Sequence, residues 1–121
     1  MNAQEVFAHF VSRVLLAEKA ERFTSLSTTK QGQQKILEGL CHQFEPAIRP
    51  SAIRTRNYEP LKNRPCFVFS APMGFGVPFN TFGEAYDKLS IEDSWLIVLT
   101  DASAGIHRPE VRWDDEKLIV V

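Results

Sequence analysis

The sequence predicts an α+β fold in which an N-terminal helical hairpin packs on a small mixed β-sheet, with element order ααβαββ. Three observations support this prediction. Apolar residues recur at helical spacing through residues 1–48. Residues 49–65 contain three prolines and show little periodicity. After residue 65 the pattern changes to short, continuous apolar runs rich in aromatic and β-branched side chains, which favours strands covered on both faces.

The chain is expected to form one domain over residues 1–121, because its 121 residues, 44% of them hydrophobic, suffice for a single core. Within it we distinguish the helical hairpin at 1–48, a basic extended arm at 49–65 and a βαββ sheet unit at 66–121. The arm is assigned to the same domain because the segments on either side are each too small to bury a stable core alone.

Two amphipathic helices are predicted in the hairpin. The first spans residues 3–20, with an apolar stripe of Phe7, Phe10, Val11, Val14 and Leu15. The second follows N-cap candidates at residues 27–29. Its buried stripe consists of Ile36, Leu37, Leu40, Cys41, Phe44 and Ile48. Pro46 and Pro50 are expected to end or kink this helix.

The arm and the sheet unit supply the predicted strands. A short edge strand is placed at 51–56. The apolar runs at 66–71 and 95–100 flank a short helix at 80–89, which indicates a βαβ unit with parallel neighbouring strands and a right-handed crossover. A closing antiparallel hairpin begins at Ile106, with Pro109 confining that strand to an edge or bulge. Asp114 and Asp115 form its turn, and its last strand spans 117–121.

Charge and cysteine content narrow the class of protein. The net charge of −1 provides no global field for nucleic acid or an anionic membrane. The charge is nevertheless uneven: residues 1–64 carry ten Lys or Arg against six Glu (net +4), and residues 65–121 carry four against nine Asp or Glu (net −5). Cys41 and Cys66 are interpreted as small core side chains in a reducing compartment, with a disulfide between them as the alternative.

The N-terminal stretch is interrupted by Glu5, His9 and Arg13, so we expect neither a signal peptide nor a membrane span. A cytoplasmic location without a membrane partner is therefore predicted. The histidines are scattered and no C-x-x-C spacing occurs, so no metal site and no cofactor are predicted.

The candidate site lies where the loops 72–80 and 101–110 leave the two strands predicted to be parallel, because ligands bind at such carboxyl ends. Its candidate binding residues are Phe75, Phe79, Asp101, Ser103, His107 and Arg108. The structural alternative is that the phenylalanines plug the end of the sheet. In the second loop, Asp101 and Ser103 would then form a turn, and Gly105 would provide the φ freedom that lets the chain reverse.

Basic residues provide a second group of candidates. The arm offers anion or nucleic-acid contacts through Arg49, Arg54, Arg56, Lys62 and Arg64. The start of the second helix could hold an anion through Lys30 and Lys35, although a solvated helix surface also explains them.

We interpret the sequence as a small non-catalytic binding or regulatory domain, of adaptor or immunity type, with a protein partner. No catalytic residues are predicted, because ionisable groups at catalytic spacing are missing. One alternative is a small enzyme or ligand-binding domain with a pocket between loops 72–80 and 101–110, using Asp101, Ser103 and His107. A second alternative is nucleic-acid binding through residues 49–64. The pattern leaves the oligomeric state open.

Overall fold

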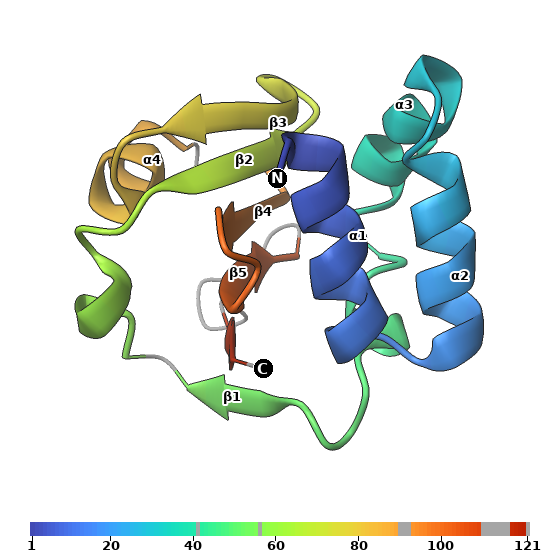
Figure 1. Ribbon diagram of the computed structural model, residues 1–121, viewed down its shortest axis with the longest axis horizontal. Coiled ribbons are helices and arrows are strands. Elements are labelled where there is room, and N and C mark those ends of the chain that lie inside the picture. The colour runs from blue at the N-terminus through green and yellow to red at the C-terminus, as the bar shows by residue number, and fades with distance from the viewer. Residues whose placement is uncertain (41, 56, 90–92, 110–116, 121) are drawn as a thin grey trace.

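The computed structural model describes residues 1–40, 42–55, 57–89, 93–109 and 117–120. Within these ranges three helices precede most of a six-stranded sheet, and a fourth helix lies between strands (Figure 1). The helices are α1 (Ala3–Val14), α2 (Ala17–Leu26), α3 (Lys30–Gly39) and α4 (Phe82–Lys88), with short 3-10 helices η1 (Glu45–Ala47) and η2 (Glu59–Leu61). The strands are β1 (Ile53–Thr55), β2 (Cys66–Ser70), β3 (Gly74–Phe79), β4 (Trp95–Leu99), β5 (Ala104–Arg108) and β6 (Lys117–Val120). The predicted α+β class is confirmed.

The sheet has the strand order β1-β6-β5-β4-β2-β3, and each of these neighbouring pairs is antiparallel. The predicted parallel pairing of β2 with β4 is therefore wrong, and the sheet is antiparallel where a mixed one was expected. In the observed register Cys66 lies opposite Leu99, and Ser70 lies opposite Trp95. The reason is β3, which runs antiparallel to β2. Helix α4 follows β3, and β4 then runs in the same direction as β3 and therefore antiparallel to β2.

Strand β3 occupies the segment that the sequence pattern assigned to a loop. Pro78 is tolerated because β3 is an edge strand and this residue is exposed. The register shifts between Val68 and Phe69, and Gly76 is the extra residue opposite this step, with φ +80°. A glycine in the left-handed region is a usual component of such a β-bulge. The glycines that suggested a loop therefore permit the irregular strand.

Helices α1 and α2 replace the single helix predicted over residues 3–20. Leu15 has an extended backbone and pairs with Ile48 in an isolated bridge. Arg49 stabilises this break, because its backbone N–H donates to the Val14 carbonyl and its guanidinium donates to the carbonyls of Leu15 and Ser12. These bonds satisfy carbonyl groups that the end of α1 would otherwise leave without partners.

The second predicted helix is shorter than expected. Thr29 caps α3 by accepting a hydrogen bond from the Gly32 backbone N–H at 3.0 Å, which confirms one of the predicted caps. The helix ends at Gly39, before Pro46, and Pro46 itself lies in the first turn of η1. Phe44 and Ile48 are buried as predicted. Cys41 lies outside the described residues. The alternative of a disulfide between Cys41 and Cys66 therefore lies outside them as well.

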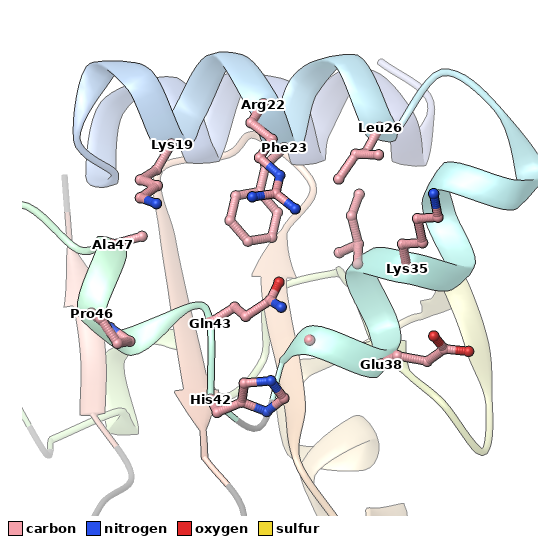
Figure 2. Close-up of a pocket in the computed structure, with 12 residues that line it drawn as sticks. Lys19, Arg22, Phe23, Leu26, Lys35, Glu38, His42, Gln43, Pro46 and Ala47 are labelled. Carbon is pink, nitrogen blue, oxygen red and sulfur yellow. The ribbon is translucent and has the colours of Figure 1, made fainter.

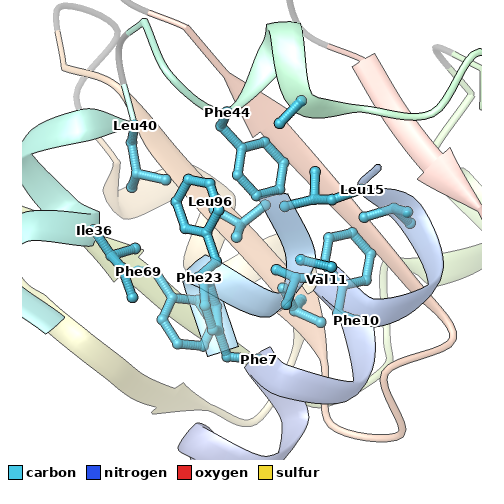
Figure 3. Packing of buried hydrophobic residues seen from close by; sticks show 14 of the residues in the cluster. Phe7, Phe10, Val11, Leu15, Phe23, Ile36, Leu40, Phe44, Phe69 and Leu96 are labelled. Carbon is cyan, nitrogen blue, oxygen red and sulfur yellow. The ribbon is translucent and has the colours of Figure 1, made fainter. Parts of the chain in front are cut away.

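The sheet is covered by helices on both faces, and side chains alternate between the two layers. Leu96 and Val98 of β4 join the apolar cluster of α1, α2 and α3, which also contains Phe7, Phe10, Phe23 and Phe44 (Figure 3). Trp95, Ile97 and Leu99 point to the opposite face and pack with Phe82 and Ala85 of α4. All five residues of β4 are buried for this reason. The predicted covering on both faces is thus correct, but it does not require parallel strands.

The remaining strands follow the prediction in part. β1 is an edge strand, and β6 pairs inside the sheet between β1 and β5. β5 lies between β4 and β6 and ends before Pro109, so Pro109 does not confine it to an edge. The turn assigned to Asp114 and Asp115 lies outside the described residues.

The turn before β5 uses a different residue from the one predicted. Ala102, with φ +61°, occupies the left-handed position, whereas Gly105 lies inside β5 with an ordinary φ. A Cβ on Gly105 would lie 2.7 Å from the ring of Phe10, so the glycine is needed for close packing between β5 and α1.

Candidate functional site

The Asp101 turn is the first of the predicted sites. Its Oδ1 accepts hydrogen bonds from the backbone N–H of Ser103 at 2.9 Å and from the Ser103 hydroxyl at 2.6 Å. Its Oδ2 accepts from the Arg64 guanidinium, which also reaches the Ser103 hydroxyl at 3.4 Å. Partial burial raises the pKa of the Asp101 carboxyl, but the bonds from Ser103 and the charge of Arg64 outweigh it and hold this pKa below 3.8. The Asp101–Ser103 part of the turn interpretation is confirmed, whereas the role it gave to Gly105 is wrong.

His107 does not belong to this turn. Its side chain is fully buried, with Nε2 2.8 Å from the Leu40 carbonyl and Nδ1 3.2 Å from a Glu45 oxygen. Both ring nitrogens thus have partners, and neither faces Ser103. A triad needs the base within hydrogen-bond reach of the nucleophile. Asp101, Ser103 and His107 therefore do not form one.

The start of the first loop and the Asp101 turn, which were expected to meet, lie at opposite ends of the sheet. Gly74, in the first loop, pairs with Ser70 and so lies at the end of the sheet where β4 begins at Trp95. The Asp101 turn follows Leu99, at the other end of β4. Four residue steps of about 3.3 Å separate these ends, roughly 13 Å. Only the last part of the first loop, around Phe79, approaches the second loop.

The other binding candidates near these loops are packed inside the fold. Phe75 is half-buried, with its ring centroid 5.2 Å from that of Phe7 and 4.8 Å from that of Phe69. Phe79 is half-buried on the α4 face. Arg108 is 2% exposed within β5. The phenylalanines therefore fit the structural alternative better than an exposed binding surface.

The cations of the basic arm lie in different surroundings. Arg49 binds the end of α1, Arg54 donates to Glu45 at 3.3 Å, and Arg64 binds Asp101. Lys62 is exposed, with its backbone carbonyl accepting from the Gly83 N–H. Arg56 lies outside the described residues. Three of the described cations of the arm have intramolecular partners at separate places, so the described cations do not form one phosphate-binding face.

A groove with a volume of about 610 Å³ lies between α2 and α3. Helix α2 forms one wall, α3 a second, and residues 42–47 the wall opposite α2 (Figure 2). We call it the α2–α3 groove; its lining residues are Lys19, Arg22, Phe23, Leu26, Lys35, Ile36, Glu38, Gly39, His42, Gln43, Pro46 and Ala47.

The groove follows from how the two helices join. α3 begins directly beside the end of α2, and a Cβ on Gly32 would overlap the Leu26 carbonyl. This close approach requires glycine. After Gly39 the chain turns back through residues 42–44 into η1, whose Ala47 carbonyl accepts a hydrogen bond from the Leu16 backbone N–H at 2.8 Å. The segment 42–47 is thereby fixed opposite α2.

Positive charge dominates the α2–α3 groove. Lys19 and Arg22 extend from α2 into it, and Lys35 extends from α3 (Figure 2). None of these three cations has an ion-pair partner among the residues that the structure describes. Glu38 points away from them in the same view. The floor is apolar and closely packed, because Phe23, Ile36 and Ala47 are at most 4% exposed.

Sequence reasoning included only Lys35 of these cations among its anion candidates. The helix predicted over residues 3–20 carries Lys19 on its polar side, and Arg22 lies beyond its predicted end. The signal that could have identified them is their spacing of three residues on the helix face that also carries Phe23 and Leu26. This signal becomes visible only when the chain breaks at Leu15 and α2 turns back along α1.

The Cys66 thiol lies buried in β2. Burial, and then the charge of Glu84, raises the pKa of the Cys66 thiol to about 12, which keeps it protonated and unreactive. In the described ranges no group of three or more His, Cys, Asp or Glu side chains is placed to hold a metal ion. Over the same ranges, no helix combines the length and apolar character of a bilayer-spanning segment.

Comparison of the chain with protein-family models, with curated proteins and with solved structures finds no match.

Proposed function

We propose that the chain is a non-catalytic binding domain and that its α2–α3 groove binds an acidic segment of a partner protein. One observation carries the proposal: three cations without ion-pair partners in the described structure surround an apolar floor in a groove of about 610 Å³. A cytoplasmic location belongs to the same proposal.

The placement of the cations favours a chain of carboxylates over one compact anion. Lys19 and Lys35 lie toward opposite ends of the groove, with Arg22 between them (Figure 2). Compact phosphate sites instead gather several backbone N–H groups around one anion. An extended peptide advances about 3.3 Å per residue, so a few acidic residues would span cations distributed along such a groove.

The floor decides which force dominates binding. Because Phe23, Ile36 and Ala47 are almost fully buried already, a ligand gains little by covering them. Affinity should therefore depend on the charges of Lys19, Arg22 and Lys35. Such affinity is sensitive to salt, because exposed charges are screened over about 8–10 Å at 0.10–0.15 M ionic strength.

The test uses a fluorescently labelled hexaglutamate peptide and fluorescence anisotropy at low salt. Arg22→Glu should weaken binding at least about tenfold, a loss of about 1.4 kcal/mol, since it replaces an attraction by a repulsion. Lys35→Glu should act in the same direction. Raising the salt to 0.5 M should reduce both the affinity and the difference between variants.

Lys30→Glu is the matched control, because it makes the same charge change on α3 at an exposed position outside the groove. It should change the affinity by less than about twofold. Equal weakening by Lys30→Glu and Lys35→Glu would mean that the affinity depends only on the net charge of the protein and not on the groove. Saturable binding of inorganic phosphate at Arg22, without peptide binding, would contradict an acidic segment as the ligand.

A further inference from the structure

A buried histidine fastens the wall of the α2–α3 groove to the sheet. His107 is fully buried in β5, and its two ring nitrogens contact the Leu40 carbonyl and the Glu45 carboxylate. Leu40 and Glu45 flank residues 42–44, and Glu45 begins η1, so these contacts hold both sides of the segment that lines the groove. The Phe44 ring packs against the imidazole at an interplanar angle of 46°, with the two centroids 4.7 Å apart.

The partners of the ring define where its hydrogens lie. A carbonyl oxygen only accepts, so Nε2 must carry a hydrogen to bond to Leu40. An ionised Glu45 also only accepts, so a hydrogen bond to it needs a hydrogen on Nδ1, and both contacts are hydrogen bonds at the same time only when the ring is protonated. A neutral ring that keeps its Nε2 hydrogen would instead direct the lone pair of Nδ1 at the Glu45 carboxylate. That contact is repulsive.

Glu45 is the charged side chain in contact with the ring among those that the structure describes. Glu45 lies on one side, and Arg54 of β1 lies beyond it, 3.3 Å from its other oxygen. Leu96 of β4 and Lys117 of β6 are the register partners of His107 in the neighbouring strands. Toward α2 the surroundings are apolar, because Phe44 contacts Phe23. Among the side chains that the structure describes, Glu45 is therefore the carboxylate placed to pair with a protonated ring.

We propose that protonated His107 holds residues 42–47 in the form that binds ligand, so that affinity of the α2–α3 groove for its acidic ligand falls when the ring loses its proton. This inference rests on the proposed function of the groove. His107 and Glu45 act as positioning residues, because neither lines the groove. The sign follows from the ion pair, which requires a protonated ring together with an ionised Glu45 and is lost when the ring loses its proton. Glu45 and η1 then lose their attachment to β5.

The decisive variant is Glu45→Gln. A glutamine amide can accept from a protonated Nδ1 and donate to a bare one, so the wall stays attached in both states of the ring. We expect the affinity of the unmodified protein for hexaglutamate to fall at least about fivefold across the titration of His107, followed by NMR of the ring nitrogens. The affinity of Glu45→Gln should change by less than about twofold over the same pH range.

His42 needs a control, because it lies in the groove and its own protonation would also favour an acidic ligand. His42→Gln should keep the dependence on the titration of His107. Loss of that dependence in His42→Gln, or its persistence in Glu45→Gln, would overturn the inference. Far-UV circular dichroism and thermal melting of each variant confirm that the fold is retained.

A ligand-free readout separates this inference from the proposed function. The methyl signal of Ala47 in the wall should shift with pH in step with the His107 ring, and should not do so in Glu45→Gln. If hexaglutamate does not bind while Ala47 still follows the ring, the proposed ligand is wrong and the attachment stands. If the ring stays neutral throughout, or Ala47 ignores its titration, the attachment by a proton is wrong whatever the groove binds.

Discussion

Asp101 acquires its ion pair with Arg64 through folding, since the two residues lie 37 positions apart in the chain. The pKa of its carboxyl is lower in the folded protein than the ordinary 3.8. A lowered carboxyl pKa contributes stability that is fully present above the ordinary value and is lost as pH falls through the folded value. Asp101→Asn should therefore reduce the free energy of unfolding near neutral pH by less than about 1 kcal/mol, because half of the side chain is exposed.

Urea titrations of Asp101→Asn and the unmodified protein at several pH values measure this contribution. The two free energies of unfolding should converge below pH 3.8. Asp87→Asn, which removes an exposed carboxylate from α4, provides the control and should have little effect at any pH. A constant deficit for Asp101→Asn down to the most acidic pH would mean that the ion pair is not its cause.

Single residues were predictable from sequence where their partners are local. Thr29 caps a helix three positions ahead, and Asp101 bonds to Ser103 two positions ahead, so both roles follow from short-range rules. His107 finds Glu45 62 positions away, and this contact depends on where η1 meets β5. Local rules contain no information about that meeting, so they grouped His107 with the nearest polar residues instead.

At the scale of elements, β3 depends on two glycines with positive φ, and only one of them is also crowded. A Cβ on Gly76 would overlap the Cβ of Ala3 in α1, whereas one on Gly74 would meet nothing closer than 3.9 Å. A left-handed conformation costs a residue with a side chain about 1–2 kcal/mol. Overpacking adds about 1–3 kcal/mol. Gly76→Ala should therefore destabilise the fold by about 2–5 kcal/mol, and Gly74→Ala by only about 1–2.

Chemical denaturation of the two variants checks this difference. The pair is well matched, because both changes add one methyl group at a positive φ in the same strand. Equal losses would show that α1 moves freely away from β3. A larger loss for Gly74→Ala would mean that the bulge opposite Val68 and Phe69 is misplaced.

The missed β3 also explains the wrong topology. Two glycines and Pro78 lower the β-propensity of residues 74–79, and the strand forms because Phe75 packs against Phe69 and α1 covers the bulge. Such tertiary support is invisible in the local pattern. Once β3 is read as a loop, β2, α4 and β4 resemble a βαβ unit, and the parallel pairing follows. The error in one edge strand thus changed the predicted direction of its neighbours and moved the predicted site.

For the molecule as a whole, the uneven charge of the two halves of the sequence is reflected in two separate grooves. The basic half supplies Lys19, Arg22 and Lys35 to the α2–α3 groove. A second groove of about 450 Å³ lies between η2 and α4, where Glu84 and Asp87 of the acidic half meet Glu59 and Lys62 of the basic half. The sequence predicted the imbalance, but the break at Leu15 and the fold of residues 42–47 decide where it becomes a concave surface.

Strand β4 connects the two apolar layers, and this connection predicts how the molecule unfolds. Leu96 faces the layer of α1, α2 and α3, and Ile97 faces the layer of α4; both are fully buried. Replacing either by Ala should cost about 2–5 kcal/mol through lost burial and a cavity. Because adjacent residues of β4 pack into both apolar layers, each variant should lower the urea midpoint of the entire structure in one cooperative transition.

Two probes distinguish one cooperative unit from two. Far-UV circular dichroism is dominated by the helices, and fluorescence in a Trp113→Phe background reports on Trp95, which packs on the α4 side. The two curves should coincide for Leu96→Ala and for Ile97→Ala. Ile53→Ala is the control, because this side chain is 66% exposed, and it should change stability by less than about 0.5 kcal/mol. If fluorescence in Ile97→Ala changes at lower urea than the helical signal, the α4 layer unfolds separately. The 121 residues would then not behave as the single domain that the sequence predicts.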